Sequence, residues 1–269
     1  MKESYYSLGL MSGTSMDGVD ASIIKTDGKT RYSAILDKYY EYPIGIYNNL
    51  LKLRAKIKTS KDLKKYDKQI KLAEKEITIF HAKSVKKILR ETKVKVDFVG
   101  FHGQTIFHNV KEKISKQLGD GKLLSKLIKK TVVYNFRKND LANNGEGAPL
   151  APIFHKLLVT KYKIKTPLTI LNIGGIANIT SINKKYELIS SEDIGPGNCL
   201  IDRWIRFKSN KKYDKYGLIA KSGNINKFIL NRSLDNFYNS KLNKKKSYDI
   251  NDFDIHFAKK LSLKDGAAT

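Results

Sequence analysis

The residues best suited to chemistry in this chain form a short turn near its start. The segment GLMSGTSMDGVDA, residues 9–21, places Gly, Ser, Thr and two Asp residues between apolar flanks. Such a turn exposes several backbone N–H groups and hydroxyls at one point, which is the donor arrangement that a phosphate chain needs. Asp17 and Asp20 would repel a phosphate, but either carboxylate could hold a divalent cation or one of its water ligands. The turn predicts phosphate handling, with an ordinary glycine-containing β-turn as the alternative.

A second polar cluster lies in FHGQTIFH, residues 101–108, at the end of an apolar run that begins at residue 96. Loops at the carboxyl ends of strands carry ligand contacts in α/β folds, and we expect this segment to be such a loop. His102, Gln104 and Thr105 supply hydrogen-bonding groups suited to sugar hydroxyls or an amide. The alternative is that the His and Gln side chains only satisfy the loop backbone.

Two charged residues complete the set of candidates. Arg137 directly follows a strand-like run and precedes a Gly-rich loop, where it could grip a carboxylate with two hydrogen bonds or form a surface ion pair with Asp140. Asp193 precedes a Gly-Pro-Gly turn that opens a helix at Asn198. A carboxylate held so closely can act as a general base, and the alternative is an Asp that stabilises the turn or caps the helix.

The elements that must position these groups follow from the spacing of apolar residues. The first half of the chain predicts, in order, strands at 5–11, 19–25 and 31–42, a long amphipathic helix with one break at most at 61–90, a buried strand at 96–101, a helix at 123–128 and a strand at 131–136. Hairpin-linked strands followed by alternating helices and strands predict an α/β layer structure.

The segment LTILNIGGIANIT, residues 168–180, repeats the opening arrangement of strand, Gly turn and strand around Gly174 and Gly175. This weak duplication suggests two related lobes with a cleft between their turns, although one more hairpin is the alternative. A helix begun by Pro149 and Pro152 would connect the two halves.

Near the end, Ser262 and Asp265 have the spacing of a helix-capping box, yet only four residues follow. A helix needs more residues than that, so we expect the chain to end inside an element, as a fragment or a truncated gene product.

Composition places the chain among globular proteins. Its 269 residues suffice for two domains, and 41% are hydrophobic and 10% aromatic. The sequence has no apolar run near the ~18 residues of a membrane span and no signal region, and its single cysteine excludes an internal disulfide. These features predict a soluble cytoplasmic protein.

The formal net charge is +26, which raises the possibility of a nucleic-acid partner. The lysines are spread along the whole chain among Asn and Ile, and arginine is scarce, which favours a solvated basic surface over a nucleic-acid face. Attraction of anionic substrates would follow in either case.

Five segments, taken in order, resemble the anhydro-N-acetylmuramic acid kinase family of bacterial cell-wall recycling. They are GLMSGTSMDGVDA, FHGQTIFH, APLAP, LNIGGIAN and DIGPGNCLID, and the resemblance runs from about Tyr5 to the last residue. It implies an α/β fold of two ribonuclease-H-like lobes of the actin-like ATPase type around a central cleft. The N-terminal lobe would span residues 1–165, and 166–269 would be the start of a second lobe that is truncated at its C-terminus.

The resemblance also implies a reaction, in which ATP and Mg²⁺ serve to convert 1,6-anhydro-N-acetylmuramic acid to N-acetylmuramic acid 6-phosphate. Asp193 matches the catalytic carboxylate, which draws a proton from the water that attacks the anomeric carbon, while the oxygen on carbon 6 receives the γ-phosphoryl group. The nucleotide would be bound by Gly13, Thr14, Ser15, Met16, Asp17, Gly18, Val19, Asp20, Gly174 and Gly175, with Asp17 at the Mg²⁺. The sugar side would comprise His102, Gln104, Thr105, Arg137 and Asn178.

Two features depart from the family pattern. Residues 144–147 read Asn-Gly-Glu-Gly where the family usually has Gly-Gly-Gln-Gly, and the family's later Gly-rich adenosine-binding segment does not occur in this sequence. A non-catalytic actin-like or chaperone-like nucleotide switch, an inactive fragment of the kinase and a basic nucleic-acid binder remain the alternatives. The expected partner is the small sugar, without nucleic acid or membrane, and a homodimer stays open.

Overall fold

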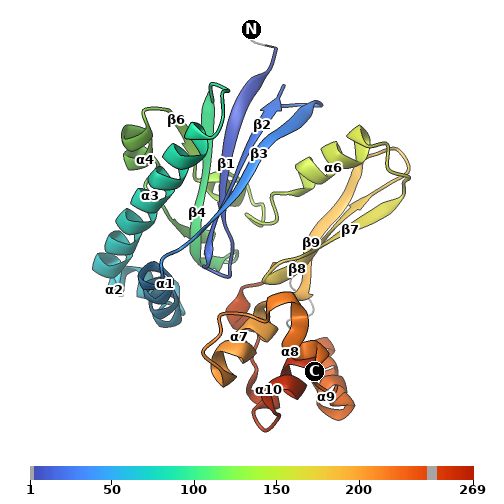
Figure 1. Cartoon of the computed structure of the whole chain (residues 1–269). Helices are drawn as coiled ribbons and strands as arrows, with labels where there is room; N and C mark the ends of the chain where they lie inside the picture. The colour runs from blue at the N-terminus through green and yellow to red at the C-terminus, as the bar shows by residue number, and fades with distance from the viewer. Residues whose placement is uncertain (1–2, 241–246) are drawn as a thin grey trace. The chain divides into compact units, whose positions relative to one another are not determined.

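The computed structural model describes residues 3–240 and 247–269. The chain divides into two compact units, Met1–Lys165 and Thr166–Thr269 (Figure 1). Each unit combines strands with helices, so the expected mixed α/β class is confirmed. Within the described ranges, no helix is long and apolar enough to cross a membrane.

The first unit is built on a six-stranded sheet in the order β3-β2-β1-β4-β5, with β6 also paired to β4. Its strands are β1 (Tyr5–Ser12), β2 (Gly18–Thr26), β3 (Tyr32–Glu41), β4 (Phe98–Asn109), β5 (Ile114–Leu118) and β6 (Thr131–Tyr134). The first three strands form antiparallel hairpins, as the alternating pattern predicted, whereas β4 is parallel to both β1 and β6. A parallel neighbour requires a crossover, and the helices between β3 and β4 provide it.

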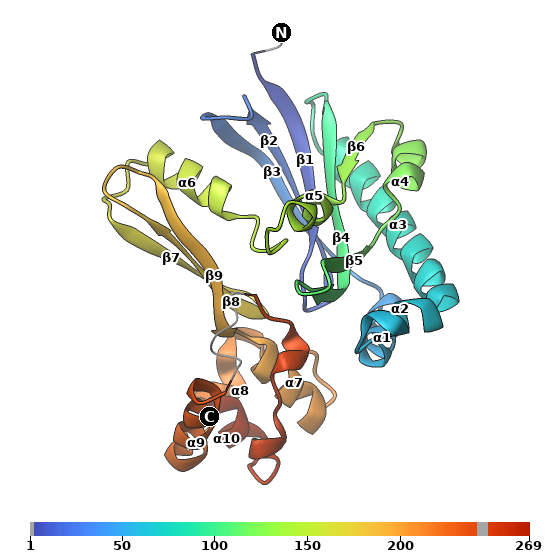
Figure 2. The same cartoon turned by 180° about the vertical axis from the view of Figure 1, so that it is seen from behind.

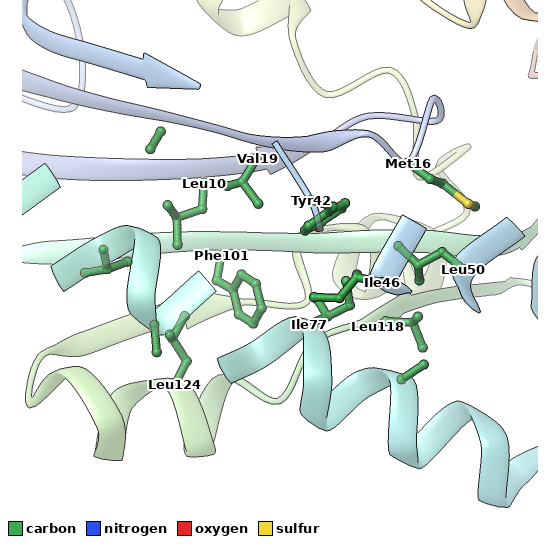
Figure 3. Close-up of a cluster of buried hydrophobic side chains, with 14 of the residues drawn as sticks. Leu10, Met16, Val19, Tyr42, Ile46, Leu50, Ile77, Phe101, Leu118 and Leu124 are labelled. Atoms are coloured by element: carbon green, nitrogen blue, oxygen red, sulfur yellow. The ribbon is translucent and has the colours of Figure 1, made fainter. Parts of the chain in front are cut away.

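That crossover consists of α1 (Ile44–Lys56), α2 (Ser60–Lys65) and α3 (Asp67–Arg90). The helix expected at 61–90 is confirmed, with its single break at Tyr66. Figures 1 and 2 show α3 lying along one face of the sheet beside α4 (Gly121–Ile128). Apolar side chains of the sheet and the helices meet there and form the core, which Figure 3 shows around Leu10, Phe101, Ile77 and Leu124.

Two shorter helices complete the first unit, α5 (Phe136–Ala142) and α6 (Pro152–Lys161). The helix expected to begin at Pro149 starts instead at Pro152, because Pro at the first helical position suits the free N–H end of a helix. Phe154 of α6 contacts the Tyr32 ring edge-on with 5.0 Å between ring centroids, which anchors this helix to β3.

The second unit holds an antiparallel sheet in the order β7-β8-β9. Its elements are β7 (Leu168–Ile173), β8 (Ile176–Ile182), β9 (Leu188–Pro196), α7 (Cys199–Lys208), η1 (Lys215–Gly217), α8 (Leu218–Lys221), α9 (Lys227–Tyr238), η3 (Ile250–Asp252), η4 (His256–Ala258) and α10 (Leu263–Ala268). The hairpin at Gly174 and Gly175 is confirmed, and so is the capping of α10, where Ser262 accepts a hydrogen bond from the N–H of Asp265. The sequence did not reveal β5 or β9.

Candidate functional site

The β1–β2 turn spans residues 13–17 and is held closely to the rest of its unit. The N–H of Met16 donates to the Gly13 carbonyl at 3.2 Å, and Ser15 Oγ donates to Asp17 Oδ1 at 2.6 Å. Met16 has a φ of 60° and a fully buried side chain, so it pins the turn to the core. The N–H of Tyr42 donates to the Asp17 carbonyl at 2.7 Å and thereby fixes the far end of the turn.

The last three residues of the expected phosphate loop belong to strand β2, because they pair with β3. Gly18 lies so close to this neighbour that an added Cβ would be 2.5 Å from the carbonyl oxygen of Tyr40. Val19 is fully buried in the core, so its side chain is not available to a ligand, and Asp20 lies on the opposite, exposed face. The loop is therefore shorter than the sequence suggested.

Partial burial, together with the charge of Asp17, raises the pKa of Asp20. The two carboxylates are thus near enough to repel each other, and a cation between them would relieve this repulsion. Within residues 3–240 and 247–269, no group of three or more His, Cys, Asp or Glu side chains forms a metal site. Protein sites for Mg²⁺ commonly offer one or two carboxylates and leave the remaining positions to phosphate and water, which these two residues fit.

The FHGQTIFH segment lies inside strand β4 and not in the loop that we expected. The strand continues beyond residue 101 because its second half pairs with β5, a partner that the sequence did not reveal. Gly103 makes this pairing possible, since its φ is +72° and an added Cβ would be 2.3 Å from the Leu118 carbonyl oxygen.

The strand directs two of the expected sugar-binding side chains into the protein interior. Gln104 is fully buried, and its Nε2 donates to the Gly13 carbonyl at 2.8 Å, so it contacts the β1–β2 turn. Thr105 is 6% exposed, and its Oγ1 accepts a hydrogen bond from Gln117. Both side chains contact protein groups, and Gln104 acts on the turn itself.

His102 and Arg137, by contrast, come together. Arg137 lies in helix α5, because residues 136–142 form a short helix after β6. His102 Nδ1 hydrogen-bonds the Gly103 carbonyl at 2.8 Å, which makes Nδ1 the protonated nitrogen and leaves Nε2 as an acceptor. Burial, and secondarily the charge of Arg137, lowers the pKa of His102 to about 4. The pair therefore offers a cation beside a neutral imidazole at pH 7.

In the second unit, the Gly174–Gly175 turn is fastened to the start of helix α7. The Gly175 carbonyl accepts from the N–H groups of Gly197 and Cys199 at 3.0 and 3.1 Å, and the Gly174 carbonyl accepts from Asn198 at 2.8 Å. An added Cβ on Gly197 would be 2.3 Å from the Gly174 oxygen, so the contact requires glycine. The amides of residues 197–199, which lead into α7, thus position the turn.

Three polar residues form a row across the second sheet. Asn172 of β7 is opposite Asn178 of β8, which is opposite Asp193 of β9. Directly paired residues place their side chains on the same face of a sheet, so the row brings two expected site residues together. Asp193 lies within β9 and precedes the Gly-Pro-Gly segment. Pairing with β8 continues as far as Pro196, so Gly195 and Pro196 belong to the strand.

Asp193 is buried, with 8% of the residue exposed, and its Oδ2 accepts a hydrogen bond from the N–H of Tyr248 at 2.8 Å. Burial, and secondarily the charge of Asp193, raises the pKa of the Tyr248 phenol. Tyr248 was missed by sequence reasoning because its contribution is a backbone N–H, which every residue except proline possesses.

Comparison with known proteins first gives the class of protein, since all the reported matches are kinases. The family model described as "Anhydro-N-acetylmuramic acid kinase" matches residues 5–266. Similar proteins of this name occur in Pelagibacter ubique, 57% identical over all of this chain and 72% of the relative, and in Agrobacterium fabrum, 36% identical over all of this chain and 73% of the relative. That of Rhodopseudomonas palustris is 38% identical over 97% of this chain and 72% of the relative. The chain belongs to the anhydro-N-acetylmuramic acid kinase family, so the expected resemblance is confirmed.

Proposed function

We propose that this chain is an ATP-dependent kinase that opens 1,6-anhydro-N-acetylmuramic acid by hydrolysis and phosphorylates it to N-acetylmuramic acid 6-phosphate. The observation that carries this proposal is the family match over residues 5–266, which includes every candidate site residue. The phosphorylation of the anhydro sugar in peptidoglycan recycling is the function of the family. The finer fold that we propose is the actin-like one, with residues 1–165 as the first lobe and 166–269 as the start of the second, in a soluble cytoplasmic enzyme.

We assign the ATP phosphates to the β1–β2 turn and to the Gly174–Gly175 turn. Each turn is fixed by hydrogen bonds to distant parts of its own unit, which supports a role in positioning. Phosphoryl transfer requires positioning and neutralisation of charge more than covalent help from the protein. Asp17, with Asp20 nearby, would hold Mg²⁺, which supplies that neutralisation when bound. Thr14 and Ser15 would contribute hydroxyl or backbone donors.

We assign the sugar to His102, Arg137 and Asn178. N-acetylmuramic acid carries a carboxylate on its lactyl group, and a guanidinium can bind a carboxylate with two parallel hydrogen bonds. A neutral His102 with an acceptor nitrogen suits a sugar hydroxyl, which the low pKa of this residue supports. Gln104 and Thr105 would support the site indirectly, because Gln104 holds the β1–β2 turn and Thr105 accepts a hydrogen bond from Gln117.

Asp193 is the proposed general base. It takes a proton from a water molecule, whose oxygen attacks the anomeric carbon as the bond between that carbon and the bridging oxygen breaks. The freed oxygen on carbon 6 then accepts the γ-phosphoryl group, and ADP leaves. The fixed N–H of Tyr248, which donates to Oδ2, supports this role because it holds the carboxylate in one orientation.

The test is to incubate the chain with ATP, Mg²⁺ and the anhydro sugar in H₂¹⁸O and to analyse the product by mass spectrometry. The expected product is the 6-phosphate with one ¹⁸O at the anomeric carbon and none in the phosphate. Label in the phosphate would refute the assignment of the bonds that form and break. ATP turnover that ignores the sugar would favour the nucleotide switch instead.

A further inference from the structure

A buried chain of hydrogen bonds lies directly behind the β1–β2 turn. Ser12, at the end of β1, has its Oγ 2.9 Å from the Tyr42 hydroxyl and 3.1 Å from His81 Nε2. The exposed fractions of Ser12, Tyr42 and His81 are 1%, 2% and 0%, so water does not compete for these bonds. The three side chains come from β1, from the segment after β3 and from helix α3, and Figure 3 shows Tyr42 within the core.

Only one direction of donation satisfies all three groups. His81 Nδ1 is 2.8 Å from the carbonyl of Ile77, which can only accept, so Nδ1 carries the proton. His81 Nε2 is then an acceptor and receives the hydroxyl proton of Ser12. The Tyr42 hydroxyl must therefore donate to Ser12 Oγ. The result is an ordered series of donors from Tyr42 through Ser12 to a neutral His81.

This series of hydrogen bonds is joined to both ends of the β1–β2 turn. Ser12 immediately precedes Gly13, and the N–H of Tyr42 donates to the Asp17 carbonyl at 2.7 Å. Gln104 is paired with Ser12 across β1 and β4, and its Nε2 donates to the Gly13 carbonyl at 2.8 Å. Tyr42 thus contacts Ser12, the residue directly before the turn, through its hydroxyl, and Asp17, at the end of the turn, through its backbone.

The arrangement is not one that stability alone would favour. Gln104 Oε1 is buried and has no hydrogen-bond partner among the described residues, which costs about 1 to 3 kcal/mol relative to a satisfied group. Apolar side chains of similar volume would fill the same space without this cost. Departures of this kind from good core design are typical of functional sites.

We propose that Ser12, Tyr42 and His81 are positioning residues that hold the β1–β2 turn in the conformation that binds the phosphates of ATP. This inference rests on the assignment of that turn to ATP under the proposed function. Among the described residues, the hydrogen bonds of Ser12, Tyr42 and His81 given above reach the first turn, whereas the candidate sugar-binding residue His102 acts on His81 through its charge. Disturbing this network should therefore change the binding of ATP more than that of the sugar.

The test compares two variants that each remove one hydroxyl, Tyr42→Phe and Ser12→Ala, with the control Ser84→Ala. Ser84 also lies on α3 and is 3% exposed, but its Oγ donates within the helix, to the Phe80 carbonyl at 3.1 Å. The expected result is a rise of about 3- to 10-fold in KM for ATP in Tyr42→Phe, which loses one hydrogen bond, and a rise at least as large in Ser12→Ala, which loses two. KM for the sugar should stay within about twofold in both variants. An unchanged KM for ATP, or an equal rise for both substrates, would overturn the proposal.

Two further measurements separate this inference from the proposed function. Calorimetric titration with ATP alone measures the affinity of each variant for ATP, whether or not the sugar is phosphorylated. If the wild-type chain binds ATP but does not phosphorylate the sugar, the proposed function is refuted, and the affinities of the variants still test the role of the network. A wild-type chain that binds no ATP overturns that role. Long-range ¹H–¹⁵N NMR should show His81 as the neutral Nδ1–H tautomer, and an Nε2–H tautomer would contradict the direction of donation.

Discussion

Replacing Asp193 by Asn removes the proposed base while keeping nearly the same shape. The Asn carbonyl can still accept the hydrogen bond from the N–H of Tyr248, so the contact at 2.8 Å loses only its charge. Hydrogen bonds to charged groups contribute about 1.5 to 3 kcal/mol and neutral ones about 0.5 to 1.5, so the free energy of unfolding should fall by about 1 to 2 kcal/mol. An amide cannot take the proton of water, and the loss of a general base lowers kcat by about 10² to 10⁴.

The assay measures kcat for the 6-phosphate, the affinity for ATP and the free energy of unfolding of each protein. Asp202→Asn is the matched control, because this substitution removes the same charge within the same unit. Asp202 lies in the first turn of α7. We expect Asp193→Asn to bind ATP normally and to lose turnover, with the control close to the wild type. If Asp193→Asn keeps nearly normal kcat once the folded fraction is taken into account, then Asp193 only fastens the Tyr248 segment and the base assignment is wrong.

Three other predictions address stability and sugar binding. Gly266→Ala should destabilise the chain by about 1 to 3 kcal/mol in chemical unfolding, although Ala favours helices, because its Cβ would be 2.2 Å from the rigid ring of Trp204; a stabilised variant would contradict this packing. Burial lowers the pKa of His81 to about 4, whereas an unfolded His titrates near 6.5. The unfolded chain therefore binds more protons at His81 between these values, and His81 alone should lower the free energy of unfolding by roughly 3 kcal/mol as pH decreases from about 6.5 to 4. Urea titrations should find this contribution missing in His81→Gln. Arg137→Lys should raise KM for the sugar about tenfold or more and leave KM for ATP unchanged, since Lys cannot bind a carboxylate through a planar fork; equal changes in both would argue for a structural role.

The hairpins were predictable because their signals are local. Apolar alternation and Gly-rich turns specify β1–β2 and β7–β8 within about ten residues each. Strands β5 and β9 were missed for the opposite reason. The segment ISSED in β9 has few β-branched or aromatic residues, and it is a strand because β8 pairs with it. The same dependence on a partner turned FHGQTIFH from an expected loop into the second half of β4.

The candidate site was predictable as a set of residue types but not as a set of contacts. Gln104 meets Gly13 across 91 positions of sequence, and Tyr248 meets Asp193 across 55. Such pairs are fixed by sheet order and chain path, which a single sequence does not state. Sequence reasoning therefore assigned Gln104 to the ligand, whereas in the structure its Nε2 donates to the Gly13 carbonyl in the turn.

The two turns assigned to phosphate are held by different means, and this decides where each can be altered. The first turn is fixed from the core, since the Gln104 amide donates to the Gly13 carbonyl and the Ser12 hydroxyl holds Tyr42, whose N–H donates to the Asp17 carbonyl. Backbone amides of residues 197–199 fix the second turn, and there only the missing side chain of Gly197 is essential. Substitutions that remove a single polar atom should thus change the geometry of the first turn in small steps. At the second turn the backbone bonds survive most side-chain changes, so its geometry depends on whether Gly197 stays glycine.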